Sequence, residues 1–192
     1  MLKFIISALK DFSDNNLYYT AGKVFKMIID RSIYDSPLGK ILLTTTETGL
    51  FGLNFYNKDD FADSGSKRKN NNIIDSAKRW LDIYFSGKEP DFTPPLDAAG
   101  TEFYHKVWNA VQEIPRGQTM TYHQLAEKLH CRCALPIGRA LSGNKVLIIS
   151  PCHRVVGSNG DLRGYSGGLE RKIKLLSLEG VKIEVREKHF VS

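Results

Sequence analysis

The organisation of this chain follows from one stretch, Ile148-Ile149-Ser150-Pro151-Cys152-His153-Arg154-Val155-Val156-Gly157. Its apolar start predicts a buried strand, which ends at a proline and is followed at once by a cysteine and a histidine. A thiol beside an imidazole is placed as a nucleophile, because the thiolate is the reactive form and a neighbouring base or cation lowers its pKa. Free cysteine is also among the most buried residue types, so the pair alone fits a structural cysteine equally well.

The sequence on either side of this stretch decides between the two interpretations. Gly143-Asn144 stands upstream, and Gly164-Tyr165-Ser166-Gly167-Gly168-Leu169-Glu170 stands downstream, before a predicted helix that ends at Leu178-Glu179-Gly180. In this order and spacing, the blocks around Pro-Cys-His-Arg-Val resemble the O6-alkylguanine-DNA alkyltransferases, also called methylated-DNA–protein-cysteine methyltransferases. The resemblance covers residues 33–180.

Length and composition allow one large domain or two small ones, because 42% of the 192 residues are hydrophobic. Three cysteines without framework spacing indicate a reducing setting, so we expect a cytoplasmic protein, associated with the nucleoid in a prokaryote. The run His130-Cys131-Arg132-Cys133 has no second ligand pair at suitable spacing, and we expect no metal. No secretory signal and no membrane span are expected, because no apolar run approaches roughly 20 residues.

The positive charge is concentrated in the half of the chain that holds the cysteine motif. The formal net charge is +6; residues 1–100 carry 13 basic and 13 acidic side chains, whereas residues 101–180 carry 11 basic and 6 acidic ones. A basic half attracts a polyanion, and nucleic acid is the commonest one. The same excess of positive charge is also compatible with a surface whose charges serve only solubility.

The first half of the chain predicts a small β-sheet with one helix. Alternating apolar residues separated by turn residues predict an antiparallel meander of strands at 31–34, 40–46 and 50–56. Apolar spacing predicts a helix over 73–85, and Pro94-Pro95 marks an extended linker. We therefore expect an N-terminal extension (1–27) and an N-terminal domain (28–97), which by resemblance is ribonuclease-H-like. The polar segment 58–72 is expected to be an exposed loop.

The second half predicts helices and a helix-turn-helix. Helices are expected over 101–114, 121–129, 136–142 and 169–178, with Lys172 on the outer face of the last one. We expect a C-terminal DNA-binding and alkyl-acceptor domain (98–180) and a tail (181–192). The predicted class is α/β (α+β), with an antiparallel β-sheet domain followed by a mostly helical, winged-helix-like domain.

The resemblance implies a self-alkylating repair protein that transfers the alkyl group of O6-alkylguanine in DNA irreversibly to Cys152. His153 would act as a base through a water, Glu179 would orient that histidine, and Asn144 would bridge the cysteine turn to the helix-turn-helix. This relay is expected to lower the pKa of the thiol. The thioether product has no easy leaving group, so one protein molecule serves one turnover and needs no cofactor. Activity on O4-methylthymine is left open.

The resemblance also implies how the target base is held after it is flipped out of the duplex. The phenol of Tyr122 would donate a hydrogen bond to the purine ring as the guanine leaves. It would also contact the phosphate that rotates when the nucleotide flips. Backbone near Cys152 and Val155 would read the exocyclic amino group of guanine. Tyr165 and Ser166 would line the pocket, with the Ser166 amide directed at the alkylated oxygen.

The expected partner is double-stranded DNA containing alkylated guanine, bound by a monomer through the minor groove. In the resembling family an arginine of the second motif helix fills the gap left by the flipped base, and the matching position here is Leu135. Arg132 and Arg139 lie close in sequence, and Arg139 shares a helical face with Leu135. An apolar side chain can still unstack a base step.

Three alternatives remain at the level of the sequence. A protein that recognises alkylated DNA without repairing it would replace the acceptor cysteine, and Cys152 is present. A helix-turn-helix regulator with an oxidant-sensing thiol would explain the charge but not Tyr165-Ser166-Gly167-Gly168 or Glu179. A cysteine hydrolase would need an oxyanion-hole motif, and the sequence offers no candidate.

Overall fold

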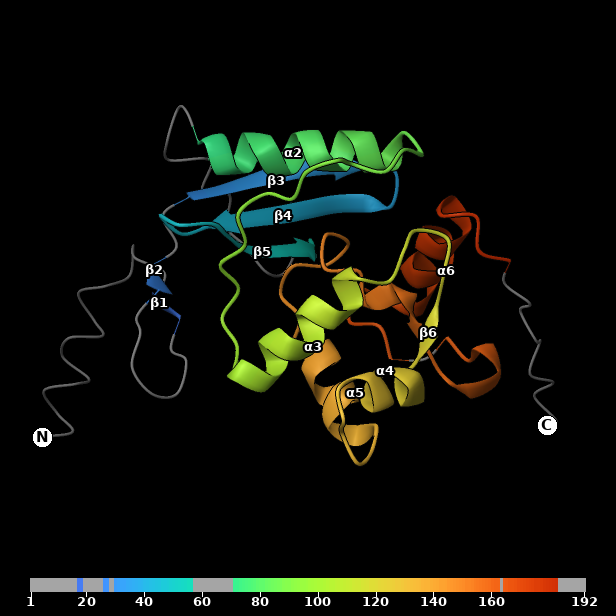
Figure 1. Ribbon diagram of the computed structural model, residues 1–192. Helices are drawn as coiled ribbons and strands as arrows, with labels where there is room; N and C mark the ends of the chain where they lie inside the picture. Colours follow the sequence, from blue (N-terminus) through green and yellow to red (C-terminus); the bar gives the residue numbers. More distant parts are fainter. Residues whose placement is uncertain (1–16, 19–25, 28–29, 57–70, 163, 183–192) are drawn as a thin grey trace, which may run out of the picture.

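The computed structural model describes residues 17–18, 26–27, 30–56, 71–162 and 164–182. A three-stranded sheet with one long helix forms the upper part of the molecule, and the helical half of the chain lies on the β5 side of that sheet (Figure 1). The expected extension, the 58–72 loop and the C-terminal tail lie almost entirely outside the described residues. In the described part, no helix is both long and apolar enough to cross a membrane.

The sheet confirms the predicted antiparallel meander. Its strands are β3 (Asp30–Ser36), β4 (Gly39–Thr45) and β5 (Leu50–Phe55), in the order β3-β4-β5. The tight β3–β4 turn needs a left-handed residue, and Gly39 supplies it with φ +110°. A separate two-residue pair, β1 (Leu17–Tyr18) with β2 (Lys26–Met27), precedes the sheet.

Helix α2 (Asn72–Phe85) covers one face of the sheet. The side chain of Asn71 caps it by accepting hydrogen bonds from the backbone N–H groups of Ile73 and Ile74. The buried residues recur every three or four positions: Ile74, Ala77, Trp80, Leu81 and Tyr84. This stripe faces the sheet, and its last member, Tyr84, reaches the boundary with the helical half.

The helical half contains the predicted helix-turn-helix. Its elements are α3 (Glu102–Gln112), β6 (Met120–Thr121), α4 (Tyr122–Lys128), α5 (Leu135–Ser142), η2 (Cys152–Arg154), β7 (Val155–Val156), η3 (Ser158–Gly160) and α6 (Leu169–Leu178). A capping box between Thr121 and Gln124 fixes the start of α4. Helices α4 and α5 form the motif, and α3 packs against α5.

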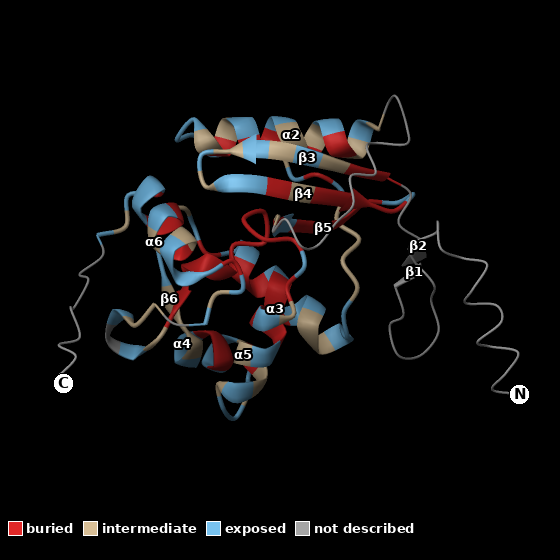
Figure 2. Ribbon diagram, turned by 180° about the vertical axis from the view of Figure 1, so that it is seen from behind, coloured by how far each residue is buried: buried red, intermediate tan, exposed pale blue. Residues whose placement is uncertain are grey.

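The segment before the cysteine is buried, but it is not the strand that its apolar residues predict. Only Val146 forms a β-bridge, with Leu53 of β5, and residues 147–149 turn sharply. Ile148 has φ +68°, an uncommon conformation for a β-branched residue, and it is 1% exposed. These residues are apolar because they are buried between the two halves. Hydrophobicity alone therefore predicted the wrong backbone conformation. Figure 2 shows this buried loop next to β5.

Helix α6 departs from expectation at one residue. Leu175 and Leu176 are buried as predicted, but Lys172 is also fully buried rather than on the outer face. Its ammonium group donates a 2.6 Å hydrogen bond to the carbonyl oxygen of Val155. A buried lysine needs such a partner, and the partner comes from the loop after the cysteine, which a helical wheel does not include.

Candidate active site

Cys152 lies in a tight loop that Asn144 fastens to the end of the helix-turn-helix. The amide nitrogen Nδ2 of Asn144 donates to the carbonyl oxygen of Ser150 at 2.9 Å and to Sγ of Cys152 at 3.2 Å. Its oxygen Oδ1 accepts from the backbone N–H of Val146 at 2.9 Å. Asn144 and Cys152 are both buried, so these bonds fix the sulfur relative to α5.

The thiol of Cys152 is protonated in this arrangement, contrary to the expected lowering of its pKa. Burial raises the pKa of Cys152 to about 11, and it outweighs the hydrogen bond from Asn144 and the charge of Lys172, which both lower it. No charged group bonds the sulfur directly among the described residues. The thiolate therefore has to form during the reaction, with a base to take its proton.

His153 stands next to the thiol as a neutral imidazole. Burial lowers the pKa of His153, against the opposing hydrogen bond and charge of Glu179. The nitrogen Nε2 lies 2.9 Å from Oε1 of Glu179, which assigns the ring proton to Nε2. The other nitrogen, Nδ1, is buried and has no hydrogen-bond partner within the described part of the chain. It is consequently the nitrogen that can accept a proton.

Glu179 is held by two further residues besides His153. Arg154 donates from Nε to Oε2 at 2.9 Å and from NH2 to Oε1 at 3.0 Å. The hydroxyl of Tyr84 donates to Oε1 at 2.8 Å. Burial alone would raise the pKa of Glu179, but the hydrogen bonds from His153 and Arg154 hold it well below its usual range. Glu179 is therefore a fixed negative charge beside the imidazole.

Two of the predicted substrate-binding residues, Tyr122 and Tyr165, lie near enough to Cys152 to be affected by its charge. Tyr122 begins α4, and the backbone of Gly164 passes so close that a Cβ there would lie 2.7 Å from the tyrosine hydroxyl. The ring of Tyr165 meets that of His153 edge-on, with centroids 6.2 Å apart, and its buried hydroxyl has no partner among the described residues. Burial, and then the charge of Cys152, raise the pKa of both phenols.

The other two predicted substrate-binding residues, Val155 and Ser166, differ in their exposure. Val155 is fully buried in β7, and its carbonyl oxygen accepts a hydrogen bond from the ammonium group of Lys172. Burial lowers the pKa of Lys172 to about 8. Ser166 is exposed in the loop before α6. The loop is compact, because a Cβ on Gly167 would collide with the ring of Tyr165.

The three predicted DNA-binding residues lie on the helix-turn-helix. Leu135 is 64% exposed at the start of α5, and Arg139 is exposed one turn later. Both line an open groove of about 730 Å³ that also includes Tyr122, Gly138 and Gly164. Arg132 is exposed in the turn between α4 and α5 but does not line the groove.

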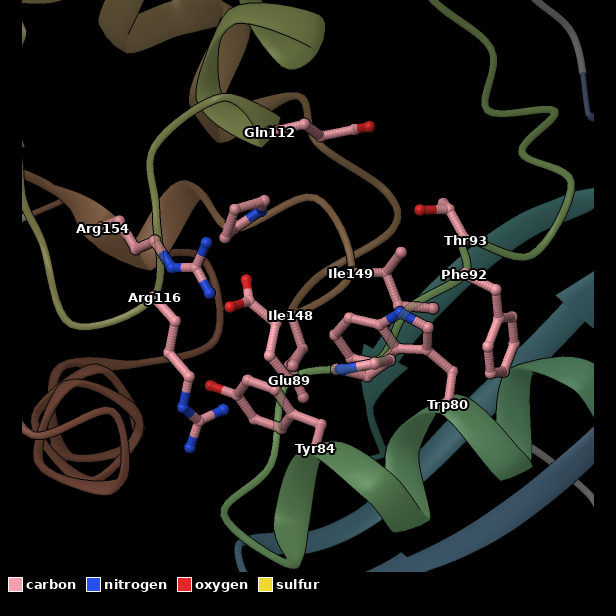
Figure 3. Close-up of a pocket in the computed structure, with 12 residues that line it drawn as sticks. Trp80, Tyr84, Glu89, Phe92, Thr93, Gln112, Arg116, Ile148, Ile149 and Arg154 are labelled. Atoms are coloured by element: carbon pink, nitrogen blue, oxygen red, sulfur yellow. The ribbon is translucent and has the colours of Figure 1, made fainter.

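A smaller cavity, of about 130 Å³, lies behind the cysteine loop at the boundary of the two halves. Pro151 and Arg154 line it from the loop, and Trp80 and Tyr84 line it from α2 (Figure 3). Among the described residues, no cluster of three or more His, Cys, Asp or Glu side chains could hold a metal ion.

Three residues of the site were not assigned a role from the sequence: Arg154, Lys172 and Tyr84. Arg154 belongs to the quoted stretch, so its place beside His153 was a usable signal. Lys172 and Tyr84 gave none, because a lysine on a polar helical face and a tyrosine in an apolar stripe are ordinary at those positions. Their partners lie 17 and 95 residues away in the sequence.

Comparisons with known proteins identify the family of the chain. Residues 29–98 match the family model of the 6-O-methylguanine DNA methyltransferase ribonuclease-like domain, and residues 102–181 match the DNA-binding domain of the same family. A methylated-DNA–protein-cysteine methyltransferase of Methanosarcina acetivorans is 42% identical over 151 residues, which are 78% of this chain and 97% of that protein.

Two solved structures from Mycobacterium tuberculosis show the same fold. The O6-methylguanine methyltransferase has a TM-score of 0.67 at 32% identity, over 81% of this chain and 95% of that one. The OGT protein in complex with DNA has a TM-score of 0.67 at 34% identity, over 78% and 92%. With both family models matched along the sequence, the chain belongs to the methylated-DNA–protein-cysteine methyltransferase family.

Proposed function

We propose that this protein repairs DNA by taking the alkyl group of O6-alkylguanine onto Sγ of Cys152. The observation that carries the assignment is the buried thiol next to an imidazole whose far nitrogen is held by Glu179. In a member of this family, that arrangement supplies both a nucleophile and a base for it. We assign the chemistry to residues 98–180, and we expect residues 28–97 to form a separate N-terminal domain.

The reaction begins with removal of the thiol proton. Nδ1 of neutral His153 takes this proton through a water, and the resulting imidazolium is stabilised by the fixed charge of Glu179. The sulfur then attacks the alkyl carbon, an S–C bond forms, and the C–O bond to guanine breaks. The electron pair of that bond goes to the guanine oxygen, and a proton supplied to the purine, with Tyr122 as its donor, completes the leaving base.

The product explains why the reaction stops after one turnover. S-alkylcysteine is a thioether, and unlike an acyl-cysteine it has no leaving group that water can displace. Each molecule is therefore consumed, and the protein acts as a stoichiometric reagent. No step needs an organic cofactor, because the protein supplies the nucleophile, the base and the proton donor.

The alkylated guanine has to leave the base stack to reach the buried thiol. We assign the pocket to Tyr122, Val155, Tyr165 and Ser166, which come from three separate segments of the helical half. Backbone near Cys152 and Val155 reads the exocyclic amino group, and the amide of Ser166 faces the alkylated oxygen. The glycines next to Tyr165 have no side chain, so the main chain of this loop can approach a planar base closely.

The open groove on the helix-turn-helix is the proposed DNA-contacting surface. Leu135 and Arg139 line it next to Tyr122, so a base leaving the duplex there is directed to Cys152. We propose that α5 enters the minor groove, that Leu135 fills the gap of the flipped base, and that Arg132 and Arg139 neutralise phosphates. One copy of the chain carries the whole site, so a monomer suffices.

The test is the mass of the intact protein after incubation with a duplex containing one O6-methylguanine. We expect each protein molecule to gain one methyl group in place of the thiol hydrogen, and the DNA to be left with guanine. Cys152→Ala serves as the control and should gain nothing while still binding the duplex. Binding without a mass change in the wild-type protein would indicate recognition without repair, and multiple turnovers would indicate a hydrolase.

A further inference from the structure

The carboxylate that holds His153 is shared between the two halves of the molecule. Oε1 of Glu179 receives three donors: the hydroxyl of Tyr84 at 2.8 Å, Nε2 of His153 at 2.9 Å and NH2 of Arg154 at 3.0 Å. His153 and Arg154 belong to the cysteine loop, whereas Tyr84 belongs to α2, which packs on the sheet. The N-terminal half therefore places a polar atom on the residue behind the proposed base.

Tyr84 is held rigidly enough to define the position of its hydroxyl. The side chain is 1% exposed, its ring stacks on that of Trp80 with centroids 5.3 Å apart, and Phe85 meets it edge-on at 5.3 Å. The guanidinium of Arg116 lies 5.0 Å from the ring centroid. Figure 3 shows the hydroxyl directed to the side of the cavity where the guanidinium groups of Arg116 and Arg154 lie.

Arg116 reinforces the same contact from the backbone side. Its NH2 group donates to the carbonyl oxygen of Leu178 at 3.0 Å, one residue before Glu179. The ring of Tyr84 and the end of α6 are thus bridged by one guanidinium, while the hydroxyl bonds the carboxylate itself. Rotating Glu179 away from His153 would break contacts on both sides of the carboxylate.

We propose that Tyr84 is a positioning residue for alkyl transfer, through which the N-terminal half fixes Glu179 and thereby the orientation and basicity of His153. The inference rests on the proposed function of Cys152. Tyr84 does not contact the reacting atoms; it acts through Glu179. A carboxylate oxygen that shares its charge among three donors holds each one less strongly, so the hydroxyl limits the pull of Glu179 on the imidazole proton.

The direction of the effect follows from the groups that face this pair. They are Tyr84 from α2, Arg116 after α3, Arg154 and Cys152 from the cysteine loop, Tyr165 from the pocket loop, and Lys172 from α6. In Tyr84→Phe the two arginines and the lysine remain, and only the neutral donor to Oε1 is lost. The imidazolium is then stabilised more strongly, so the pKa of His153 rises. The ring stays protonated up to a higher pH, and a protonated ring cannot accept the thiol proton.

The experiment measures the alkylation rate of Cys152 as a function of pH in wild-type protein and in Tyr84→Phe. Two reagents are used: free O6-methylguanine, which needs no base flipping, and iodoacetamide, which tests the thiol independently of any repair activity. The peptide containing Cys152 is quantified by mass spectrometry, because Cys131 and Cys133 are accessible to iodoacetamide as well. Melting curves confirm that Tyr84→Phe, which keeps the packed ring, is folded.

We expect Tyr84→Phe to lower the plateau rate on the order of tenfold, because the base is less well oriented, and to move the acid limb upward by on the order of half a pH unit. Tyr34→Phe is the matched control, since its hydroxyl also donates to a carboxylate, that of Asp82 on α2, at 2.8 Å. It should leave both quantities unchanged. In a Glu179→Gln background, Tyr84→Phe should add no further change.

Each outcome decides one of the two proposals. An unchanged plateau and acid limb in Tyr84→Phe with both reagents would overturn the positioning role, even if wild-type protein repairs DNA. Effects of Tyr84→Phe that persist in the Glu179→Gln background would overturn it as well, because they would not pass through Glu179. Failure of wild-type protein to accept a methyl group would refute the proposed function, and the iodoacetamide profile would still judge Tyr84.

Discussion

The side chain of Asn144 donates a hydrogen bond to the sulfur of Cys152 at 3.2 Å while its oxygen accepts from the backbone of Val146. Asn144 therefore connects the end of α5, the β-bridge between Val146 and β5, and the sulfur of Cys152, and it fixes their relative positions. Because Asn144, Val146 and Cys152 are buried, no water can replace the amide without a change in packing. This one side chain couples the groove on the helix-turn-helix to the thiol.

Replacing Asn144 by alanine should reduce both stability and reactivity. The backbone N–H of Val146 would lose its hydrogen bond to Asn144 in a buried position, and the Ser150 carbonyl would lose one of its two donors. We expect a loss on the order of 3 kcal/mol in the free energy of unfolding, because unsatisfied buried groups cost about 1 to 3 kcal/mol each. Urea denaturation measures it.

The alkylation rate should fall too, since the hydrogen bond from Asn144 lowers the pKa of Cys152 and its loss leaves burial unopposed at that point. Asn54→Ala is the control: its amide donates to the carbonyl of Lys145 at 3.0 Å in an exposed position. That change should cost about 1 kcal/mol or less and should not alter the rate. An equal loss of rate in both variants would refute the special role of Asn144.

Cys152 is predicted to be the sole alkyl acceptor. Cys131 and Cys133 lie in the turn between α4 and α5, partly or fully exposed, whereas Cys152 is buried beside His153. Peptide mapping after reaction with a methylated duplex should place the methyl group on Cys152 alone. Replacing both other cysteines by serine should leave the stoichiometry at one methyl group per protein. A label on Cys131 or Cys133 would show that the acceptor is misassigned.

Glu179→Gln should change how stability depends on pH. The folded pKa of Glu179 is depressed below its ordinary value of 4.5, because the hydrogen bonds from His153 and Arg154 outweigh burial. The charged carboxylate therefore stabilises the fold above pH 4.5, and this contribution is lost as pH falls below that value towards the folded pKa. At neutral pH the variant should lose about 3 to 5 kcal/mol, because Arg154 stays buried without its ion partner.

The stability difference between wild type and Glu179→Gln should accordingly shrink in acid, measured by denaturation from pH 7 to pH 3. Glu170→Gln is the matched control, since Glu170 also pairs with a cation, Lys174, but its side chain is 80% exposed. Solvent screens that pair, and its loss should be small at every pH. A difference for Glu179→Gln that stays constant down to pH 3 would argue against a buried ionised carboxylate.

The sequence predicted the sheet and most helices because their signals are local. Turn residues at Gly39 and Gly49 separate strands of alternating residues, and Asn71 and Thr101 cap helices that begin within one residue of the expected place. The strand predicted before Cys152 is not present, because the signals there are not local. Its apolar residues are buried by β5, nearly a hundred residues earlier, and tertiary contacts set a turn with φ +68° at Ile148.

The site shows the same division between local and distant causes. Cys152 and His153 are adjacent and stand out in the sequence, while Glu179 was assigned only through the family resemblance. Tyr84 and Lys172 could not be found, because each acquires its role from a partner on another segment. The pKa of Cys152 was also misjudged: a neighbouring histidine suggests activation, but the depth of burial, which the sequence does not give, raises the pKa of the thiol.

Leu135→Arg is predicted to speed repair of duplex DNA and to leave the reaction with free O6-alkylguanine nearly unchanged. Leu135 is 64% exposed at the start of α5, on the groove that Tyr122 also lines. Leucine can fill the gap left by a flipped base but cannot hydrogen-bond the orphaned partner or attract phosphate. An arginine adds a charge, so the slope of log affinity against log salt should steepen by up to about one unit.

The control variants are Arg139→Ala and Arg132→Ala, which remove the nearest exposed cations. If Leu135 is the residue that enters the base stack, each should weaken duplex binding modestly by removing a phosphate contact, and Leu135→Ala should slow duplex repair more than either. The free base, which needs no flipping, separates these effects from the chemistry at Cys152. If Leu135→Arg slows duplex repair while one arginine variant nearly abolishes it, that arginine fills the gap, and the correspondence with the family along α5 is shifted by the intervening residues.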